Sequence, residues 1–148
     1  MKSVYLIGSL RNPKVPELGN YLRTQGVEVF DDWYGAGPEA DDCWQKYETE
    51  RGRSYLEALD GHAAWNTFNF DHRHLSRCAA CVLVMPAGKS GHLEFGFFIG
   101  LGKPGYVLFD AEPERWDVMY RFAQGVYCDK ELLLKDLTNH PLSIKKQP

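Results

Sequence analysis

Glu94 and Asp71 are the two side chains of this sequence that are best placed to do chemistry. Glu94 lies in the segment Pro86–Gly96, directly after the apolar run Cys81–Met85. Such a run predicts a buried strand, and the apolar spacing that starts at Leu93 predicts a helix behind it. The positive end of the helix dipole stabilises a carboxylate in the first turn, so we expect an ionised, nucleophilic Glu94. The structural alternative is a Glu that merely caps its helix.

Asp71 lies between two aromatic residues, Phe68 and Phe70, and the run His72–His74. An acid close to apolar rings has a raised pKa and can act as a proton donor. The alternatives are a surface residue or a salt-bridge partner of Arg73. Together with Glu94, Asp71 makes a pair of carboxylates of the kind that glycosyl chemistry uses, one as nucleophile and one as acid/base.

The elements that must position these acids alternate between strand and helix. We expect strands at 4–7, 27–30, 81–85, 106–109 and 125–127, and helices at 13–25, 39–59, 62–76, 93–101 and 130–137. This order predicts one α/β domain over residues 1–148, with the tail 143–148 frayed. Its fold is expected to be doubly wound, flavodoxin-like or Rossmann-like, with about five parallel strands and helices on both faces.

The carboxyl ends of parallel strands meet at one edge of the sheet, where ligands bind in this class of fold. The first strand is followed by Gly8–Pro13, whose backbone N–H groups, Ser9 hydroxyl and Arg11 could bind a sugar hydroxyl or a single phosphate. No dinucleotide or nucleoside-triphosphate motif is present. An ordinary tight turn is the alternative.

The second strand is followed by a loop over residues 31–38 that contains two acids and two large rings. Trp33 and Tyr34 could sandwich a flat heterocycle by stacking. Alternatively, Trp33 folds the loop onto the core.

Composition narrows the class of protein. The chain has 148 residues, of which 44% are apolar and 25% charged, as in soluble domains. A net charge of -3 gives no reason to expect binding to a nucleic acid polymer or a membrane surface. We see no signal peptide and no apolar stretch that could span a bilayer, so we expect a cytoplasmic protein with no membrane partner. Aromatic residues make up 14%, which favours a ring-lined site or interface.

Cys78 and Cys81 have the spacing of a metal or redox pair, and two histidines lie upstream. A second such pair, which would complete a zinc site, is missing from the sequence. Cys81 also begins an apolar strand, where reduced buried cysteines are common. We therefore expect no metal site.

Three segments together resemble the nucleoside 2-deoxyribosyltransferase family, which includes related nucleoside 5'-monophosphate N-glycosidases. They are Tyr5–Arg11, Asp71 before the third strand, and the Glu-Phe-Gly to Gly-Lys-Pro stretch within Gly91–Pro104. The resemblance covers about the first three quarters of the chain. It implies that Glu94 attacks the anomeric carbon of the sugar and that Asp71 protonates or hydrogen-bonds the departing base.

The same resemblance supplies the substrate-binding candidates. Tyr5, Gly8, Ser9, Leu10 and Arg11 would shape the pocket for the sugar and its 5' end. Further candidates come from the neighbouring loops: Asp32, Trp33, Gly88, Ser90 and Gly91.

The sequence departs from the family at Gly88, where the transferases commonly carry another acid. Lys89 and Ser90 stand beside it and, with Arg11, could hold a 5'-phosphate, which would favour a nucleotide hydrolase. Asp31 or Asp32 could instead supply the missing acid from another loop.

The sequence therefore leads to three hypotheses. The first is transfer of a 2'-deoxyribosyl group between nucleobases through a covalent glycosyl-Glu94 intermediate, with no metal or organic cofactor. The second is an N-glycosidase that hydrolyses a nucleoside or its 5'-monophosphate, and the third is a non-catalytic nucleotide-binding module. A homo-oligomer is expected from the resemblance, and the ring-rich region 112–127 is our candidate contact. Core packing of those rings is the alternative.

Overall fold

The fold is built on a five-stranded parallel sheet. The structure is a computed structural model in which residues 3–139 are described, so the expected frayed tail 143–148 lies outside them. The strands are β1 (Ser3–Ile7), β2 (Glu28–Phe30), β3 (Ala80–Val84), β4 (Gly105–Leu108) and β5 (Gly125–Tyr127). They lie in the order β2-β1-β3-β4-β5, and every neighbouring pair is parallel. This confirms the expected doubly wound α/β fold and its flavodoxin-like strand order.

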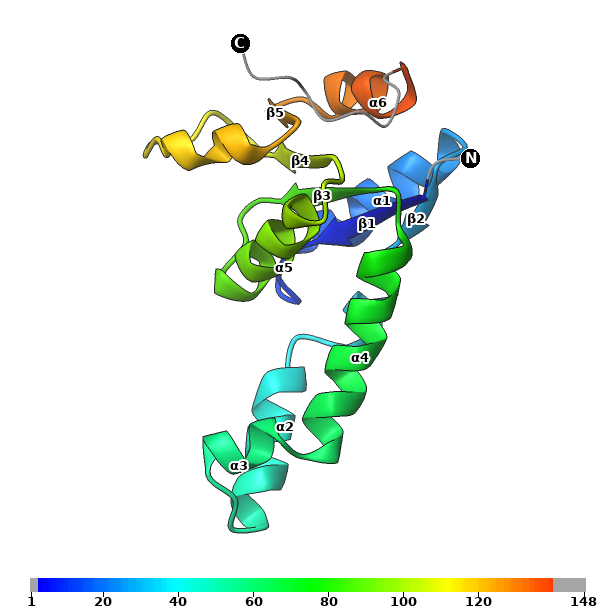
Figure 1. Cartoon of the computed structure of the whole chain (residues 1–148). Coiled ribbons are helices and arrows are strands. Elements are labelled where there is room, and N and C mark those ends of the chain that lie inside the picture. The colour runs from blue at the N-terminus through cyan, green and yellow to red at the C-terminus, as the bar shows by residue number, and fades with distance from the viewer. Residues whose placement is uncertain (1–2, 140–148) are drawn as a thin grey trace.

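Helices cover both faces of the sheet, as expected (Figure 1). Side chains alternate between the faces because successive strand residues point in opposite directions. Val4 and Leu6 pack with α1 (Lys14–Thr24) and α6 (Lys130–Asn139), whereas Tyr5 and Ile7 pack with residues of α4 (His62–Arg77) and α5 (Lys89–Gly100). Both predicted catalytic acids lie on the helices that cover this second face, Asp71 on α4 and Glu94 on α5.

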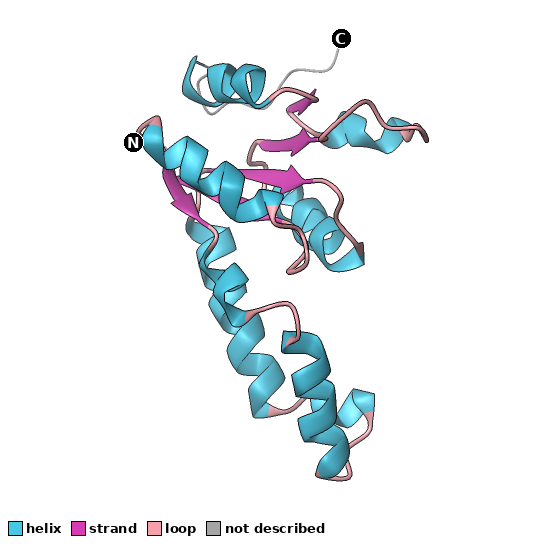
Figure 2. Ribbon diagram, turned by 180° about the vertical axis from the view of Figure 1, so that it is seen from behind, coloured by secondary structure: helices cyan, strands magenta, loops and turns pink. Residues whose placement is uncertain are grey.

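A helical arm, residues 40–77, extends away from the sheet (Figure 2). It comprises α2 (Ala40–Glu50), α3 (Tyr55–Leu59) and α4, and only the carboxyl end of α4 reaches the sheet (Figure 1). The single helix expected over 39–59 is wrong. Gly52 has a φ of 75°, which breaks the helix after α2, and a capping box between Ser54 and Glu57 starts α3.

Two short 3-10 helices lie in the loops after β2 and β4. The first, η1 (Asp32–Ala36), replaces most of the loop expected over 31–38, and the second, η2 (Val118–Phe122), lies between β4 and β5. No helix among residues 3–139 has the length and apolar character that a membrane crossing requires.

Candidate functional site

Tyr5, Asp71 and Glu94 come together on the face of the sheet that α4 and α5 cover. Tyr5 is the middle residue of β1, Asp71 lies on α4 and Glu94 on α5. The Tyr5 hydroxyl donates a hydrogen bond to the Glu94 carboxyl, and the charges of Asp71 and Glu94 act on one another. The structure thus brings together three residues that are far apart in the sequence.

Glu94 is half-buried and holds its proton more tightly than an ordinary glutamate. Burial and the nearby charge of Asp71 raise its pKa to about 7, against which the hydrogen bond from Tyr5 acts. Our expectation of a first-turn, readily ionised carboxylate is therefore wrong. Because α5 begins at Lys89, Glu94 lies in the second turn, where the helix dipole is weaker.

Asp71 is also half-buried, and burial raises its pKa to about 6. The direction of this shift agrees with the expectation of a proton donor. Among residues 3–139, the ion pairs include neither Asp71 nor Glu94. The two acids therefore act on each other and on Tyr5 without a neutralising cation in direct contact.

Tyr5 remains protonated because its pKa is raised, first by burial and then by the charges of Glu94 and Asp71. Its ring stacks on Phe30 with centroids 5.4 Å apart, and Phe30 stacks on His74 at 4.0 Å. This column of rings fixes the Tyr5 side chain. Its hydroxyl is therefore a positioned donor toward Glu94.

The loop after β1 lies beside the loop after β3. Asn12 Nδ2 donates to the carbonyl oxygen of Pro86 at 3.4 Å, which ties the two loops together. The Ser9 hydroxyl accepts from the backbone N–H of Arg11 at 3.1 Å, and the Arg11 guanidinium faces Asp42 at 3.4 Å. Leu10 is half-buried beside them.

Glycines allow close packing at both of these loops. A Cβ at Gly8 would lie 2.8 Å from Val15 Cγ2, so Gly8 lets α1 approach the strand end. Gly91 is buried, and a Cβ there would lie 3.3 Å from Ile7 Cγ2. Gly88 caps α5, and Ser90 is exposed in its first turn.

The loop after β2 contributes mainly to the fold. Asp31 is buried and pairs with Arg23 on α1, so it is not a free acid that could replace the one missing at Gly88. The indole N–H of Trp33 donates to the carbonyl oxygen of Leu6 at 2.7 Å, which favours the alternative that Trp33 folds the loop onto the core. Asp32 is exposed, and its charge acts on His74.

The Gly-Lys-Pro sequence after α5 has a structural role, because Gly102 ends the helix and Lys103 contacts α4. Gly102 has a φ of 82° and ends the helix. The Lys103 ammonium donates to the backbone carbonyls of Ser76 and Cys78 at the carboxyl end of α4. This part of the motif joins α4 and α5, the two helices that carry Asp71 and Glu94.

The four cysteines are free thiols, and Cys78 and Cys81 are buried. Burial raises the pKa of both thiols. No group of three or more His, Cys, Asp or Glu residues within 3–139 has the arrangement of a metal site.

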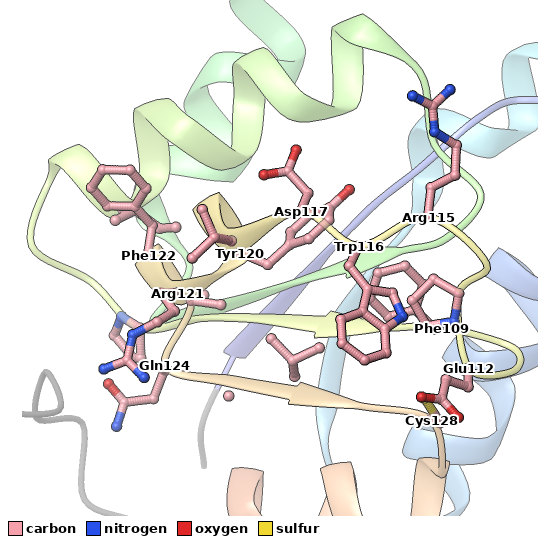
Figure 3. Close-up of a pocket in the computed structure, with 18 of the residues that line it drawn as sticks. Phe109, Glu112, Arg115, Trp116, Asp117, Tyr120, Arg121, Phe122, Gln124 and Cys128 are labelled. Atoms are coloured by element: carbon pink, nitrogen blue, oxygen red, sulfur yellow. The ribbon is translucent and has the colours of Figure 1, made fainter.

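The structure contains a cavity of about 600 Å³ that is not lined by Tyr5, Asp71 or Glu94. It lies between the carboxyl half of α5 and residues 112–128, and its aromatic walls are Phe109, Trp116, Tyr120 and Phe122 (Figure 3). Neither Glu94 nor Asp71 lines it.

His92 links the wall of this cavity to α5, because its Nε2 lies 2.9 Å from the Tyr120 hydroxyl. Sequence reasoning assigned no role to His92 and considered Tyr120 only as part of the candidate subunit contact over residues 112–127. They are 28 residues apart, and no motif connects them.

Similarity to known proteins was found by comparing structures and not by comparing sequences, and it shows the fold. No protein-family profile matches the sequence, and no curated protein resembles it significantly. A 2-deoxyribosyltransferase from the psychrotolerant bacterium Bacillus psychrosaccharolyticus has a similar structure, with a TM-score of 0.61 at 16% identity. The match covers 99% of each chain, so the two proteins share their fold over nearly their whole length.

Two further solved structures are similar to this chain. A conserved protein from Enterococcus faecalis V583 has a TM-score of 0.56 at 12% identity, over 93% of this chain and 97% of that one. A CMP N-glycosidase from Clostridium botulinum has a TM-score of 0.49 at 17% identity, over 92% of this chain and 98% of the other.

Proposed function

We propose that this protein is a nucleoside 2-deoxyribosyltransferase that moves a 2'-deoxyribosyl group between nucleobases through a glycosyl-enzyme intermediate. The observation that carries the proposal is the group formed by Tyr5, Asp71 and Glu94, in which both half-buried acids have raised pKa values and the Tyr5 hydroxyl donates to Glu94. The fold shared with a deoxyribosyltransferase supports the same reaction class.

In the first step, a Glu94 carboxylate oxygen bonds to C1' of the nucleoside as the N-glycosidic bond breaks. The bonding electrons leave with the base nitrogen, and Asp71 gives a proton to the departing base. Positive charge develops on the sugar in an oxocarbenium-like transition state, which the carboxylate stabilises electrostatically.

In the second step, a nitrogen of the incoming base attacks C1', and the bond between C1' and Glu94 breaks. The electrons return to the carboxylate, and Asp71 takes a proton from the new base. Tyr5 donates its hydrogen bond to the released carboxylate, which favours the ionised Glu94.

Hydrolysis is the second candidate function, because water can resolve the same intermediate. Lys89 and Ser90 lie in the first turn of α5, and the Asn12–Pro86 contact brings the loop that carries Arg11 beside it. A cation and free backbone N–H groups at this turn would suit a 5'-phosphate. This arrangement favours a nucleoside 5'-monophosphate as the substrate of a hydrolase.

A mixture of a 2'-deoxynucleoside and a foreign base tests the proposal. A new deoxynucleoside supports transfer, and free sugar supports hydrolysis; a 5'-monophosphate assayed in parallel would yield sugar phosphate. Glu94→Ala should abolish either product, whereas His62→Asn, an exposed change at the start of α4, should not. Ligand binding without turnover of any substrate would favour a non-catalytic binding module instead.

We also propose that the active form is a homo-oligomer. An apolar stripe runs along the outer faces of α4 and α5: Trp65, Phe68, His72, Leu93, Phe97 and Leu101. Ring contacts connect Phe68 to His72 and His72 to Phe97, so the stripe crosses from one helix to the other.

The apolar stripe adjoins the proposed catalytic acids. His72 follows Asp71 on α4, and Leu93 precedes Glu94 on α5. Leu93 is 76% exposed, which is costly for a large apolar side chain unless another surface covers it. We therefore place the subunit contact on the stripe, where a neighbouring copy would close the site, in preference to residues 112–127.

A further inference from the structure

His92 lies between two polar groups that come from different parts of the chain. Its Nδ1 lies 2.8 Å from the carbonyl oxygen of Gly88, the cap of α5. Its Nε2 lies 2.9 Å from the hydroxyl of Tyr120 in η2. Both ring nitrogens are therefore engaged, which fixes the orientation of the imidazole.

The two partners determine which nitrogen carries the proton in the neutral ring. The Gly88 carbonyl can only accept, so Nδ1 carries the hydrogen and donates to it. Nε2 then has a free lone pair and accepts from the Tyr120 hydroxyl. A glutamine amide can reproduce an acceptor near the Nε2 position, whereas the shorter asparagine reproduces only the donor near Nδ1.

Tyr120 is itself held in place. Its ring packs edge-on against Phe109 at the end of β4, with centroids 5.5 Å apart, and its side chain is half-buried. Burial and the charge of Asp117 raise the pKa of its hydroxyl, which therefore remains a donor. The contact between His92 and Tyr120 thus joins α5 to the segment that walls the cavity (Figure 3).

The position of His92 on α5 complements that of Glu94. At about 100° per residue, side chains two apart lie on nearly opposite sides of a helix. Glu94 is hydrogen-bonded to Tyr5 of β1 on one side of the helix, and His92 is hydrogen-bonded to Tyr120 on the other. Between them, the missing side chain at Gly91 lets α5 press against Ile7 and Leu83. The start of the helix is therefore held from three directions.

We infer that His92 is a positioning residue for Glu94, acting through its hydrogen bond to Tyr120. The inference rests on the proposed function. When the bond is lost, α5 can rotate and Glu94 spends less time aimed at C1', so chemistry slows while substrate binding is unchanged.

The test compares Tyr120→Phe, His92→Asn and His92→Gln with the unmodified protein. Single-turnover formation of the glycosyl-enzyme should slow about 2- to 10-fold in Y120F and H92N, which is the effect of one lost hydrogen bond, with KM unchanged. H92Q should retain the rate, and the double variant Y120F/H92N should be no slower than either single change. Tyr21→Phe on α1 serves as the control for removing a hydroxyl.

Limited trypsin digestion gives a readout that needs no activity. Cleavage after Arg115, which precedes η2, and after Arg121, which lies in its last turn, should be faster in Y120F and H92N and unchanged in H92Q. Unchanged turnover in Y120F, or additive losses in the double variant, would overturn the positioning role. An inactive unmodified protein would overturn the proposed function and this role together, and the digestion would still report whether the contact exists.

Discussion

At the scale of single residues, the two acids work against the stability of the fold. Each is half-buried without a cation in direct contact among the described residues, so each prefers its neutral form. This explains why Glu94 holds its proton to a higher pH than our sequence-based expectation allowed. Tyr5 offsets part of that cost with its hydrogen bond.

Glu94→Gln should stabilise the protein above pH 7 while abolishing turnover. The pKa of Glu94 rises from 4.5 to about 7 on folding, so its contribution to stability is fully present below pH 4.5 and is lost as the pH rises through 7. The glutamine stays neutral and still accepts from Tyr5. We expect a gain of about 1–3 kcal/mol in the free energy of unfolding at pH 8, and little gain at pH 4.

Urea unfolding across this pH range measures the effect. Glu112→Gln, in an exposed loop, is the matched control and should show no such trend. A Glu94→Gln variant that is less stable than the unmodified protein at pH 8 would show that the folded structure does not disfavour the charged form of Glu94.

The pH dependence of kcat/KM should be bell-shaped. The reactive form of the pair carries one proton on Asp71, with Glu94 ionised; because the pKa of Glu94 lies above that of Asp71, this is the minor arrangement of the singly protonated pair. Since the two pKa values are about 6 and about 7, the pair gains a second proton below this range and loses its last proton above it. Activity should therefore peak between pH 6 and 7.

Asp71→Asn offers a check on this assignment. It removes the negative charge that raises the pKa of Glu94, so Glu94 should ionise at lower pH. The remaining activity of D71N should be low and should increase with pH as Glu94 ionises. A bell-shaped profile that survives in D71N would contradict the role of Asp71.

At the scale of elements, the sequence predicted the strands well, because runs of apolar residues report them directly. It missed the start of α5, which lies at Lys89 and not near Leu93. The first buried residue of that helix is Gly91, which has no side chain and so adds nothing to an apolar pattern. The residue type of Glu94 identified it as the proposed catalytic acid, but the sequence placed it in the wrong turn of the helix.

Side-chain contacts between residues that are far apart in the chain could not be predicted from the sequence either. The strand order places Tyr5 near α5, yet no local pattern states that its hydroxyl meets Glu94. The same holds for Trp33, whose hydrogen bond to Leu6 joins the segment after β2 to strand β1. Such contacts depend on packing geometry, whereas sequence patterns record only the period and the chain order.

Lys103→Met should weaken the junction between α4 and α5. The ammonium donates to two carbonyls at the carboxyl end of α4, those of Ser76 and Cys78, and methionine leaves them without this partner. We expect a loss of about 1–2 kcal/mol in the free energy of unfolding. Lys135→Met on the exposed side of α6 is the control, and equal effects of the two changes would contradict this role.

At the scale of the whole molecule, the helical arm contains little core of its own. Only Glu48 and Ala58 are buried in α2 and α3, and Glu48 pairs with Arg53. The arm nevertheless extends far from the sheet (Figure 2). It also exposes many aromatic rings. Cover by another copy would supply the apolar contacts that a single chain leaves unmade.

Phe68→Glu combined with Leu93→Glu should convert an oligomer into a monomer. Both side chains are more than half exposed on the apolar stripe, so the charges would be buried only in the assembly. Size-exclusion chromatography with light scattering reads out the mass. Leu132→Glu on α6, which is 55% exposed, is the matched control. A monomeric unmodified protein at working concentration would contradict the assembly.

The most direct test of the account is to trap the sugar on the enzyme. A 2'-fluoro-arabino nucleoside slows the release of the intermediate, so the labelled protein can be digested and its peptides weighed. We expect the added sugar mass on the peptide that contains Glu94, and no label in Glu94→Ala. A label on any other residue, or full turnover with no label at all, would contradict Glu94 as the nucleophile.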